Sequence, residues 1–153
     1  FHIYGDGPMR PTLKQMIHHL NLEDKVKLFD SVSIDHIAEI MKNSDIGVIP
    51  KRNDPFGGEA FSTKTLEFMS CGVPIILSRT KIDQYYFNDA IVKFFEPENE
   101  DHLAAAILAL YTDKKARELQ VENACRFAEM NTWEVKKQIY LDIIDRLLMD
   151  GER

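Results

Sequence analysis

Short apolar runs alternate with longer amphipathic stretches from the start of the chain to about residue 95. The short runs have the length of buried strands, and the stretches between them have the spacing of helices. The expected strands cover residues 1–4, 26–29, 46–49, 74–77 and 91–95, and the expected helices cover residues 10–20, 34–43, 62–71 and 82–87. This order predicts an α/β fold, a three-layer sandwich with a parallel sheet covered by helices on both faces.

The remainder of the chain is predicted to be helical, over residues 99–111, 114–130 and 133–149. In the last of these helices, apolar residues recur every four positions, and Thr132 precedes it as an N-cap. A stripe of this kind is typical of a helix that packs on the core. Its members are Val135, Ile139, Ile143 and Leu147.

Ligands of parallel sheets bind at the carboxyl ends of the strands. The loops at residues 5–8, 30–33 and 51–61 follow three expected strands, so we expect all three to open on that edge. The third loop leads into the helix expected to begin near Ser62 or Thr63, which Gly72 and Pro74 would end. The sequence therefore places the candidate ligand-binding site at this third loop.

Two carboxylates, Glu59 and Glu67, stand eight positions apart around the expected start of that helix. Free backbone N–H groups at a helix start attract anions. Each carboxylate can accept hydrogen bonds from a pair of neighbouring hydroxyls. The arrangement fits a ligand with a diphosphate and with hydroxyls on either side, which describes a nucleotide-sugar.

Composition limits the other classes of function. With 153 residues and 44% hydrophobic content, the chain predicts one domain over residues 1–153. A net charge of −6 argues against a nucleic-acid partner. No apolar run approaches the roughly 20 residues that span a bilayer, and no targeting segment is seen, so a cytoplasmic protein is expected. Cys71 and Cys125 are expected to be free thiols, and the scattered histidines predict no metal site.

Several segments together resemble a known family. Glu59 and Glu67 with the following residues 69–76, Met-Ser-Cys-Gly-Val-Pro-Ile-Ile, are similar to the E-x7-E segment and next strand of retaining glycosyltransferases with the GT-B fold, often called family 4. The Gly-Asp-Gly-Pro turn at residues 5–8, the strand at residues 45–50 and Thr-Trp-Glu at residues 132–134 also resemble that family. The resemblance covers nearly the whole chain.

The resemblance implies the Rossmann-like C-terminal half of a GT-B enzyme, which binds the donor. An N-terminal acceptor domain and the first strand would be absent, and the chain alone would transfer nothing. The last helix would cross back to pack on that absent domain, so part of its apolar stripe would be exposed in this chain. The full-length enzyme would move a sugar from a nucleotide diphosphate carrier to a hydroxyl acceptor, a sugar or lipid-linked sugar, with retention and without a metal or other cofactor. Bacterial polysaccharide or glycolipid synthesis is the implied setting, with possible membrane association at the inner face through the missing domain.

The resemblance also implies roles for individual residues. Glu67 would accept hydrogen bonds from the ribose, and Glu59 would face the donor sugar and act as the catalytic residue. Gly58 would let the backbone approach the ligand. The backbone N–H groups expected to meet the phosphates and sugar belong to Ala60, Phe61, Ser62 and Thr63, and the expected phosphate-binding cations are Lys51, Arg52 and Lys64. The family usually has Gly at the position of Ser62.

The nucleotide cleft would be bordered by Gly5 and Gly7, and the nucleobase would meet the backbone of Ser31 and Val32. Asp30 stands where the family usually has Gly. The family commonly takes a further Arg and Lys from a segment upstream of the Gly5 turn, and this chain begins after that segment.

Other functions remain open on sequence grounds. A non-catalytic nucleotide-sugar binding module would keep the same fold, and a sugar-nucleotide epimerase would convert the donor without an acceptor. A dehydrogenase is disfavoured because no third glycine follows Gly5 and Gly7 at the required spacing. A flavodoxin-like signalling domain is disfavoured because Asp30 and Asp45 form no acidic cluster. The nucleobase, the donor sugar, the acceptor and the linkage are not specified by the sequence.

Overall fold

The structure is a computed structural model that describes residues 1–150. It divides into two compact units, residues 1–40 and the chain from residue 41 onward. The predicted alternation of strands and helices is confirmed, because every expected strand and helix is present within about four residues of its expected bounds. The strands form two separate parallel sheets, one in each unit.

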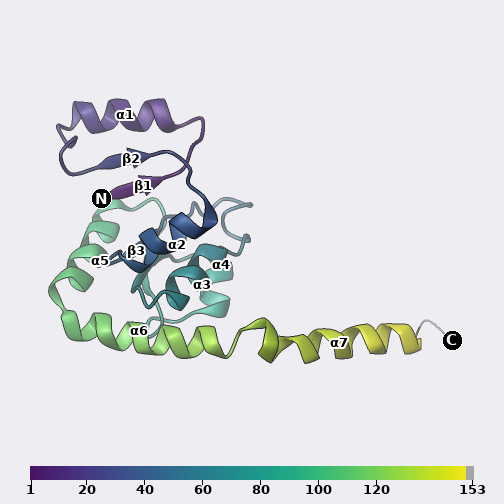
Figure 1. The fold of residues 1–153 in the computed structure, drawn as a ribbon. Helices are drawn as coiled ribbons and strands as arrows, with labels where there is room; N and C mark the ends of the chain where they lie inside the picture. The colour runs from purple at the N-terminus through teal and green to yellow at the C-terminus, as the bar shows by residue number, and fades with distance from the viewer. Residues whose placement is uncertain (151–153) are drawn as a thin grey trace. The chain divides into compact units, whose positions relative to one another are not determined.

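The first unit is a strand, a helix and a second strand. The strands β1 (His2–Tyr4) and β2 (Lys27–Phe29) pair in parallel, with His2 opposite Lys27 and Tyr4 opposite Phe29, and α1 (Arg10–His19) connects them (Figure 1). The rings of Tyr4 and Phe29 stack with their centres 4.6 Å apart. The helix α2 (Ile34–Lys42) begins in this unit.

The second unit contains the larger core. Its parallel sheet has the order β3 (Gly47–Ile49), β4 (Ile75–Ser78) and β5 (Lys93–Phe95). Its helices are α3 (Thr63–Ser70), α4 (Lys81–Tyr86), α5 (Glu100–Thr112), α6 (Lys114–Glu129) and α7 (Trp133–Asp150) (Figure 1). The central strand β4 is buried along its whole length, as expected for a parallel strand covered on both faces.

Successive side chains of β4 point to opposite faces of this sheet. Ile75 and Leu77 pack in a cluster with Met69 of α3 and Ala124 of α6. Ile76 packs in a second cluster on the other face, with Ala106 and Leu110 of α5 and with Phe95. Helices therefore cover both faces, which confirms the predicted three-layer α/β arrangement.

The end of α3 follows the signal expected from the sequence. Gly72 has a φ of 69°, which a glycine adopts without strain, and Val73 N–H donates to the Phe68 carbonyl across the turn at 3.1 Å. The preceding Cys71 and Cys125 of α6 are both free, partly buried thiols. The turn at Gly72 therefore ends α3 before the chain enters β4.

The apolar stripe of α7 does not pack on the core, so the prediction from periodicity is wrong, whereas the exposed stripe that the family resemblance implies is observed. Its four members are 52–68% exposed, although Val135 N–H donates to Thr132 Oγ1 at 3.4 Å as expected for the predicted cap. In Figure 1, α7 continues beyond the end of α6 and leaves the layer formed by α3 and α6. Of the helices between residues 1 and 150, none is long and apolar enough to cross a membrane.

Gln120 of α6 joins that helix to the start of β4. Its side chain is 6% exposed, its Oε1 accepts from Ile75 N–H at 2.9 Å, and its Nε2 donates to the Ile75 carbonyl at 3.3 Å. We expect Gln120→Leu to lower the free energy of unfolding by about 1–3 kcal/mol, because the buried N–H of Ile75 loses its acceptor. Chemical denaturation measures this loss.

The control for this variant is Gln138→Leu, which changes the same residue type on the exposed helix α7. Surface substitutions of this kind usually change stability by less than about 0.5 kcal/mol. Equal stability of the two variants would show that the Gln120 bridge contributes nothing.

Candidate functional site

The loop that joins β3 to α3 lines two hollows of the second unit. The first, which we call the amide hollow, has a volume of about 390 Å³ and lies against the start of α3. The second, the tyrosine hollow, has a volume of about 690 Å³ and lies against α4. No residue lines both hollows.

The amide hollow is lined by Lys51, Arg52, Asp54, Phe56, Gly57, Ala60, Phe61, Ser62, Thr63 and Lys64. The tyrosine hollow is lined by Asn53, Glu59, Arg79, Lys81, Ile82, Gln84, Tyr85 and Tyr86.

The amide hollow favours an anion. Ser62 occupies the N-cap position of α3 with extended backbone angles (φ −95°, ψ 111°), and its side chain makes no capping hydrogen bond. The first backbone N–H groups of α3 therefore lie at the hollow with the positive end of the helix dipole. Three cations line the same hollow: Lys51 and Arg52 are paired with Asp83 and Asp54, and Lys64 has no ion pair within residues 1–150. The structure brings these predicted site residues together.

Two glycines allow the loop to fold back on itself. A Cβ at Gly57 would stand 2.3 Å from the Arg52 carbonyl oxygen, and one at Gly58 would stand 3.0 Å from the Asp54 carbonyl oxygen. The Asp54 side chain accepts from Gly57 N–H at 2.6 Å, and its carbonyl accepts from Gly58 N–H at 2.8 Å. Gly57 is thus required by space where the loop turns toward α3, and a side chain at Gly58 would displace its neighbour by a few tenths of an ångström.

A buried ion pair fixes the start of this loop. Lys51 Nζ donates to Asp83 Oδ2 at 2.7 Å, with side chains only 12% and 0% exposed. Thr80 Oγ1 also donates to Asp83 Oδ2, at 2.5 Å, and Lys51 N–H donates to Ser78 Oγ at 2.7 Å. The other carboxylate oxygen of Asp83 is buried and has no hydrogen-bond partner within residues 1–150. Lys51 is therefore held by α4, whereas Arg52 and Lys64 are exposed.

A second contact holds the loop near its middle. Ile82 N–H in the first turn of α4 donates to the Gly58 carbonyl at 3.2 Å. Glu59 follows directly, and its Oε1 accepts from Lys81 Nζ at 2.8 Å. This hydrogen bond raises the pKa of Lys81, so Lys81 stays protonated throughout the neutral range. The Glu59 carboxylate therefore has a cationic partner when no ligand is bound.

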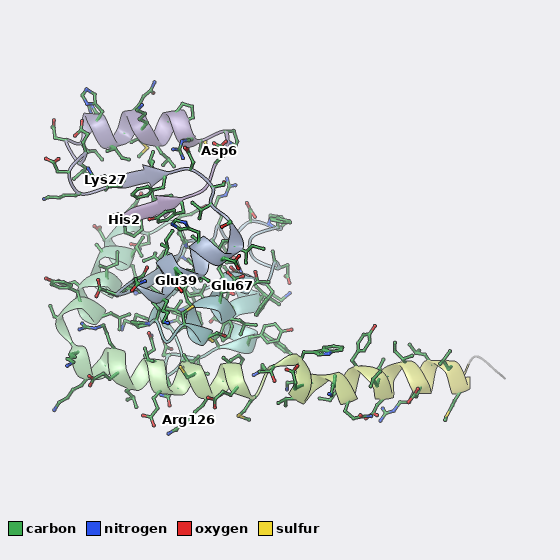
Figure 2. The ribbon with its side chains drawn as sticks, in the orientation of Figure 1. His2, Asp6, Lys27, Glu39, Glu67 and Arg126 are labelled. Carbon is green, nitrogen blue, oxygen red and sulfur yellow. The ribbon has the colours of Figure 1, made fainter. Side chains whose placement is uncertain are left out.

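Glu67 lies one turn inside α3, as predicted, and its side chain is exposed (Figure 2). It lines neither hollow, whereas Glu59 lines the tyrosine hollow. The sequence placed the two carboxylates around the expected start of this helix, and the structure has Glu59 before the loop-to-helix junction and Glu67 beyond it.

In the first unit, Arg10 holds together the two loops that the sequence singled out. Arg10 Nη1 donates to the carbonyls of Gly5 at 2.8 Å and Phe29 at 2.9 Å, and its Nη2 pairs with Asp30 Oδ1 at 2.8 Å. Sequence reasoning missed Arg10, because nothing marks an arginine at the start of a helix as a link between two strand ends. The φ of 137° at Gly5 requires a glycine.

The other predicted residues of this unit are on its surface. Gly7 is exposed, and its N–H donates to Asp6 Oδ1 at 2.8 Å within the local turn. Ser31 and Val32 follow β2 and are also exposed. Among the residues that the structure describes, no group of three or more His, Cys, Asp or Glu side chains could hold a metal ion.

Comparison with known proteins identifies the family. Residues 1–127 match the family described as glycosyl transferases group 1, which is most of the chain. The chain belongs to this family. A curated relative from Schizosaccharomyces pombe, the phosphatidylinositol N-acetylglucosaminyltransferase gpi3 subunit, is 30% identical over 122 residues. That alignment covers 80% of this chain and 25% of the relative, so this group 1 chain spans about a quarter of the relative's length.

Solved structures confirm the fold of this group 1 chain. Sucrose-phosphate synthase from Thermosynechococcus elongatus superposes with a TM-score of 0.83 at 19% identity, over 97% of this chain and 38% of that one. HepE from Anabaena, in complex with UDP-glucose, gives a TM-score of 0.80 at 20% identity, over 94% of this chain and 40% of that one. The neighbours are GT-B glycosyltransferases, and the chain has the Rossmann-like C-terminal half of that fold.

Proposed function

We propose that the chain is the donor-binding half of a GT-B glycosyltransferase that moves a sugar from a nucleotide diphosphate sugar to a hydroxyl acceptor. The observation that carries this proposal is the amide hollow, where the start of α3 and three cations lie next to the loop that bears Glu59. HepE, a structural neighbour, was solved with UDP-glucose, which supports this class of ligand.

In this proposal the diphosphate occupies the amide hollow. The backbone N–H groups of Phe61, Ser62 and Thr63 bind its oxygens, whereas the N–H of Ala60 already donates to the Phe56 carbonyl at 2.9 Å. Arg52 and Lys64 balance its charge. Both side chains are exposed, and Arg52 pairs with Asp54 at 3.6 Å, whereas the charge of Lys51 is already balanced by the buried Asp83. Glu67 accepts hydrogen bonds from the ribose hydroxyls.

The donor sugar would lie at Glu59. Its hydroxyls replace Lys81 as hydrogen-bond donors to the Glu59 carboxylate, or the carboxylate stabilises the positive charge that develops on the sugar. The nucleobase and the nucleotide cleft are assigned to the backbone of Ser31 and Val32 and to the turn at residues 5–8 with Gly5 and Gly7.

The proposed reaction retains the anomeric configuration and uses no metal. The acceptor hydroxyl oxygen attacks the anomeric carbon on the face from which the diphosphate leaves. The bond from that carbon to the diphosphate breaks, and the hydroxyl proton passes to an oxygen of the leaving diphosphate. The acceptor would be a sugar or lipid-linked sugar bound with the help of an N-terminal domain, in polysaccharide or glycolipid synthesis, with peripheral membrane association through that domain.

A titration with nucleotides tests the donor site. Calorimetry of the protein with UDP, GDP, ADP and their sugar conjugates is expected to show saturable binding of one nucleotide. We expect Glu67→Ala to weaken that binding by about 1–3 kcal/mol, because the ribose hydroxyls lose a charged acceptor. Glu134→Ala, which removes an exposed carboxylate from α7, is the matched control and should bind like the unchanged protein.

Two results would count against the proposal. Absence of binding for every nucleotide would contradict the donor function itself. Equal affinity for the unchanged protein and Glu67→Ala would leave the donor function in place but would remove Glu67 from the ribose.

A further inference from the structure

Two tyrosines at the end of α4 are exposed beside the carboxylate assigned to the donor sugar. Tyr85 is 79% exposed and Tyr86 is 45% exposed, and both line the tyrosine hollow together with Glu59. The volume of this hollow, about 690 Å³, is within the range of roughly 300–1,000 Å³ that small-molecule sites occupy. The proposed donor contacts use only the Glu59 edge of the hollow, so most of its lining has no assigned role.

The two tyrosine rings are held in place although they are exposed. Their centres lie 4.9 Å apart in an edge-to-face contact, and the Tyr86 ring makes a second such contact with Phe61 of the loop at 5.1 Å. The helix beneath them is anchored by the fully buried Asp83 and by Phe87, which is 4% exposed. Rigid aromatic side chains lose little conformational freedom on binding, which favours affinity.

The remaining lining indicates a neutral, hydroxyl-rich ligand. Arg79 is already paired with Asp89 at 3.2 Å and with Glu96 at 3.1 Å, and Lys81 is paired with Glu59. The charges of the hollow are therefore largely balanced, which disfavours an anionic ligand. The amides of Asn53 and Gln84 supply both donors and acceptors. Hydroxyls match such groups, and the C–H face of a pyranose ring matches an aromatic surface.

We propose that the tyrosine hollow is the part of the acceptor site that this domain contributes, a subsite for the saccharide that accepts the sugar. This inference rests on the proposed function, because it takes Glu59 to mark the position of the donor sugar. No residue lines both hollows, so the diphosphate and the acceptor occupy separate spaces that adjoin the same loop. An acceptor sugar on Tyr85 and Tyr86 presents its hydroxyl to the anomeric carbon at Glu59. The new glycosidic bond forms there as the bond to the diphosphate breaks, and the proton leaves on the diphosphate.

Saturation-transfer NMR with methyl glycosides of glucose, galactose, mannose and N-acetylglucosamine tests the subsite on the protein. At least one glycoside should bind without nucleotide, and Tyr85→Ala and Tyr86→Ala should each weaken its affinity roughly 3- to 10-fold. Tyr111→Ala removes a similarly exposed tyrosine, 73% exposed on α5, and should change nothing. The affinity for the nucleotide, measured on the same samples, should stay the same in all three variants.

Four results would overturn the inference. If nucleotide binds but none of the glycosides does, the hollow is not a saccharide site and the donor function stands. The same conclusion follows if a glycoside binds equally well to the unchanged protein and to both α4 variants. If the two tyrosine variants weaken nucleotide and glycoside equally, the tyrosines serve the donor. A protein that binds neither ligand would contradict both proposals.

Discussion

Replacing Asp83 with alanine is expected to lower the free energy of unfolding by about 3–5 kcal/mol. The substitution leaves the Lys51 ammonium, whose side chain is 12% exposed, without its carboxylate, and removing one partner of a buried ion pair has costs of this size. The Thr80 hydroxyl loses its acceptor as well. Urea denaturation followed by circular dichroism gives the change directly.

A second substitution separates the loss of the pair from the loss of packing. Adding Lys51→Met to Asp83→Ala removes the unpaired charge, so the double variant should be more stable than Asp83→Ala alone. The comparison variant Asp89→Ala breaks an exposed pair with Arg79 and should lose no more than about 1 kcal/mol. If Asp83→Ala were as stable as Asp89→Ala, the buried pair would have no role in holding the loop.

Replacing Glu59 with glutamine is expected to lower kcat of the full-length protein by about 10²- to 10³-fold. Glutamine keeps the size and a hydrogen-bonding oxygen but removes the charge that stabilises the developing positive charge on the donor sugar. The affinity for the free nucleoside diphosphate should change little, because Glu59 is assigned to the sugar. Steady-state kinetics with saturating donor, together with calorimetry of the nucleotide, measures the two effects.

The appropriate control is Glu122→Gln, which removes another exposed carboxylate that pairs with a cation, Arg126 of α6. It should leave kcat unchanged. Turnover of Glu59→Gln at the rate of the unchanged protein would exclude a catalytic role for Glu59. A full-length protein with no turnover at all, but with nucleotide binding, would instead favour the non-catalytic binding module that the sequence left open.

Local patterns in the sequence were enough to predict most of the fold. The apolar run Ile75, Ile76 and Leu77 predicted a buried parallel strand, and all three residues are 0% exposed. Gly72 predicted the end of α3, and Thr132 predicted the cap of α7. Periodicity alone misjudged the stripe of α7, because it shows which side of a helix is apolar but not what lies against it, whereas the family resemblance implied an exposed stripe.

The contacts of the candidate site depend on residues far apart in the sequence. The pair of Lys51 and Asp83 joins the end of β3 to α4, and no spacing rule connects two positions that far apart. The same applies to Glu59 and Lys81. The sequence indicated the carboxylates of the candidate site but not the side chains that pair with them. The roles of Glu59, Glu67 and the predicted cations remain predictions for the experiments above.

The two attachments of the β3–α3 loop have a consequence for the evolution of its ligand preference. Lys51 is held by Asp83 and Ser78, and Gly58 is held by Ile82. Residues 52–56 between these points are all exposed, so most side chains there can change with little effect on stability. Because this segment also lines both hollows, selection can alter what the domain recognises while the fold beneath it is conserved.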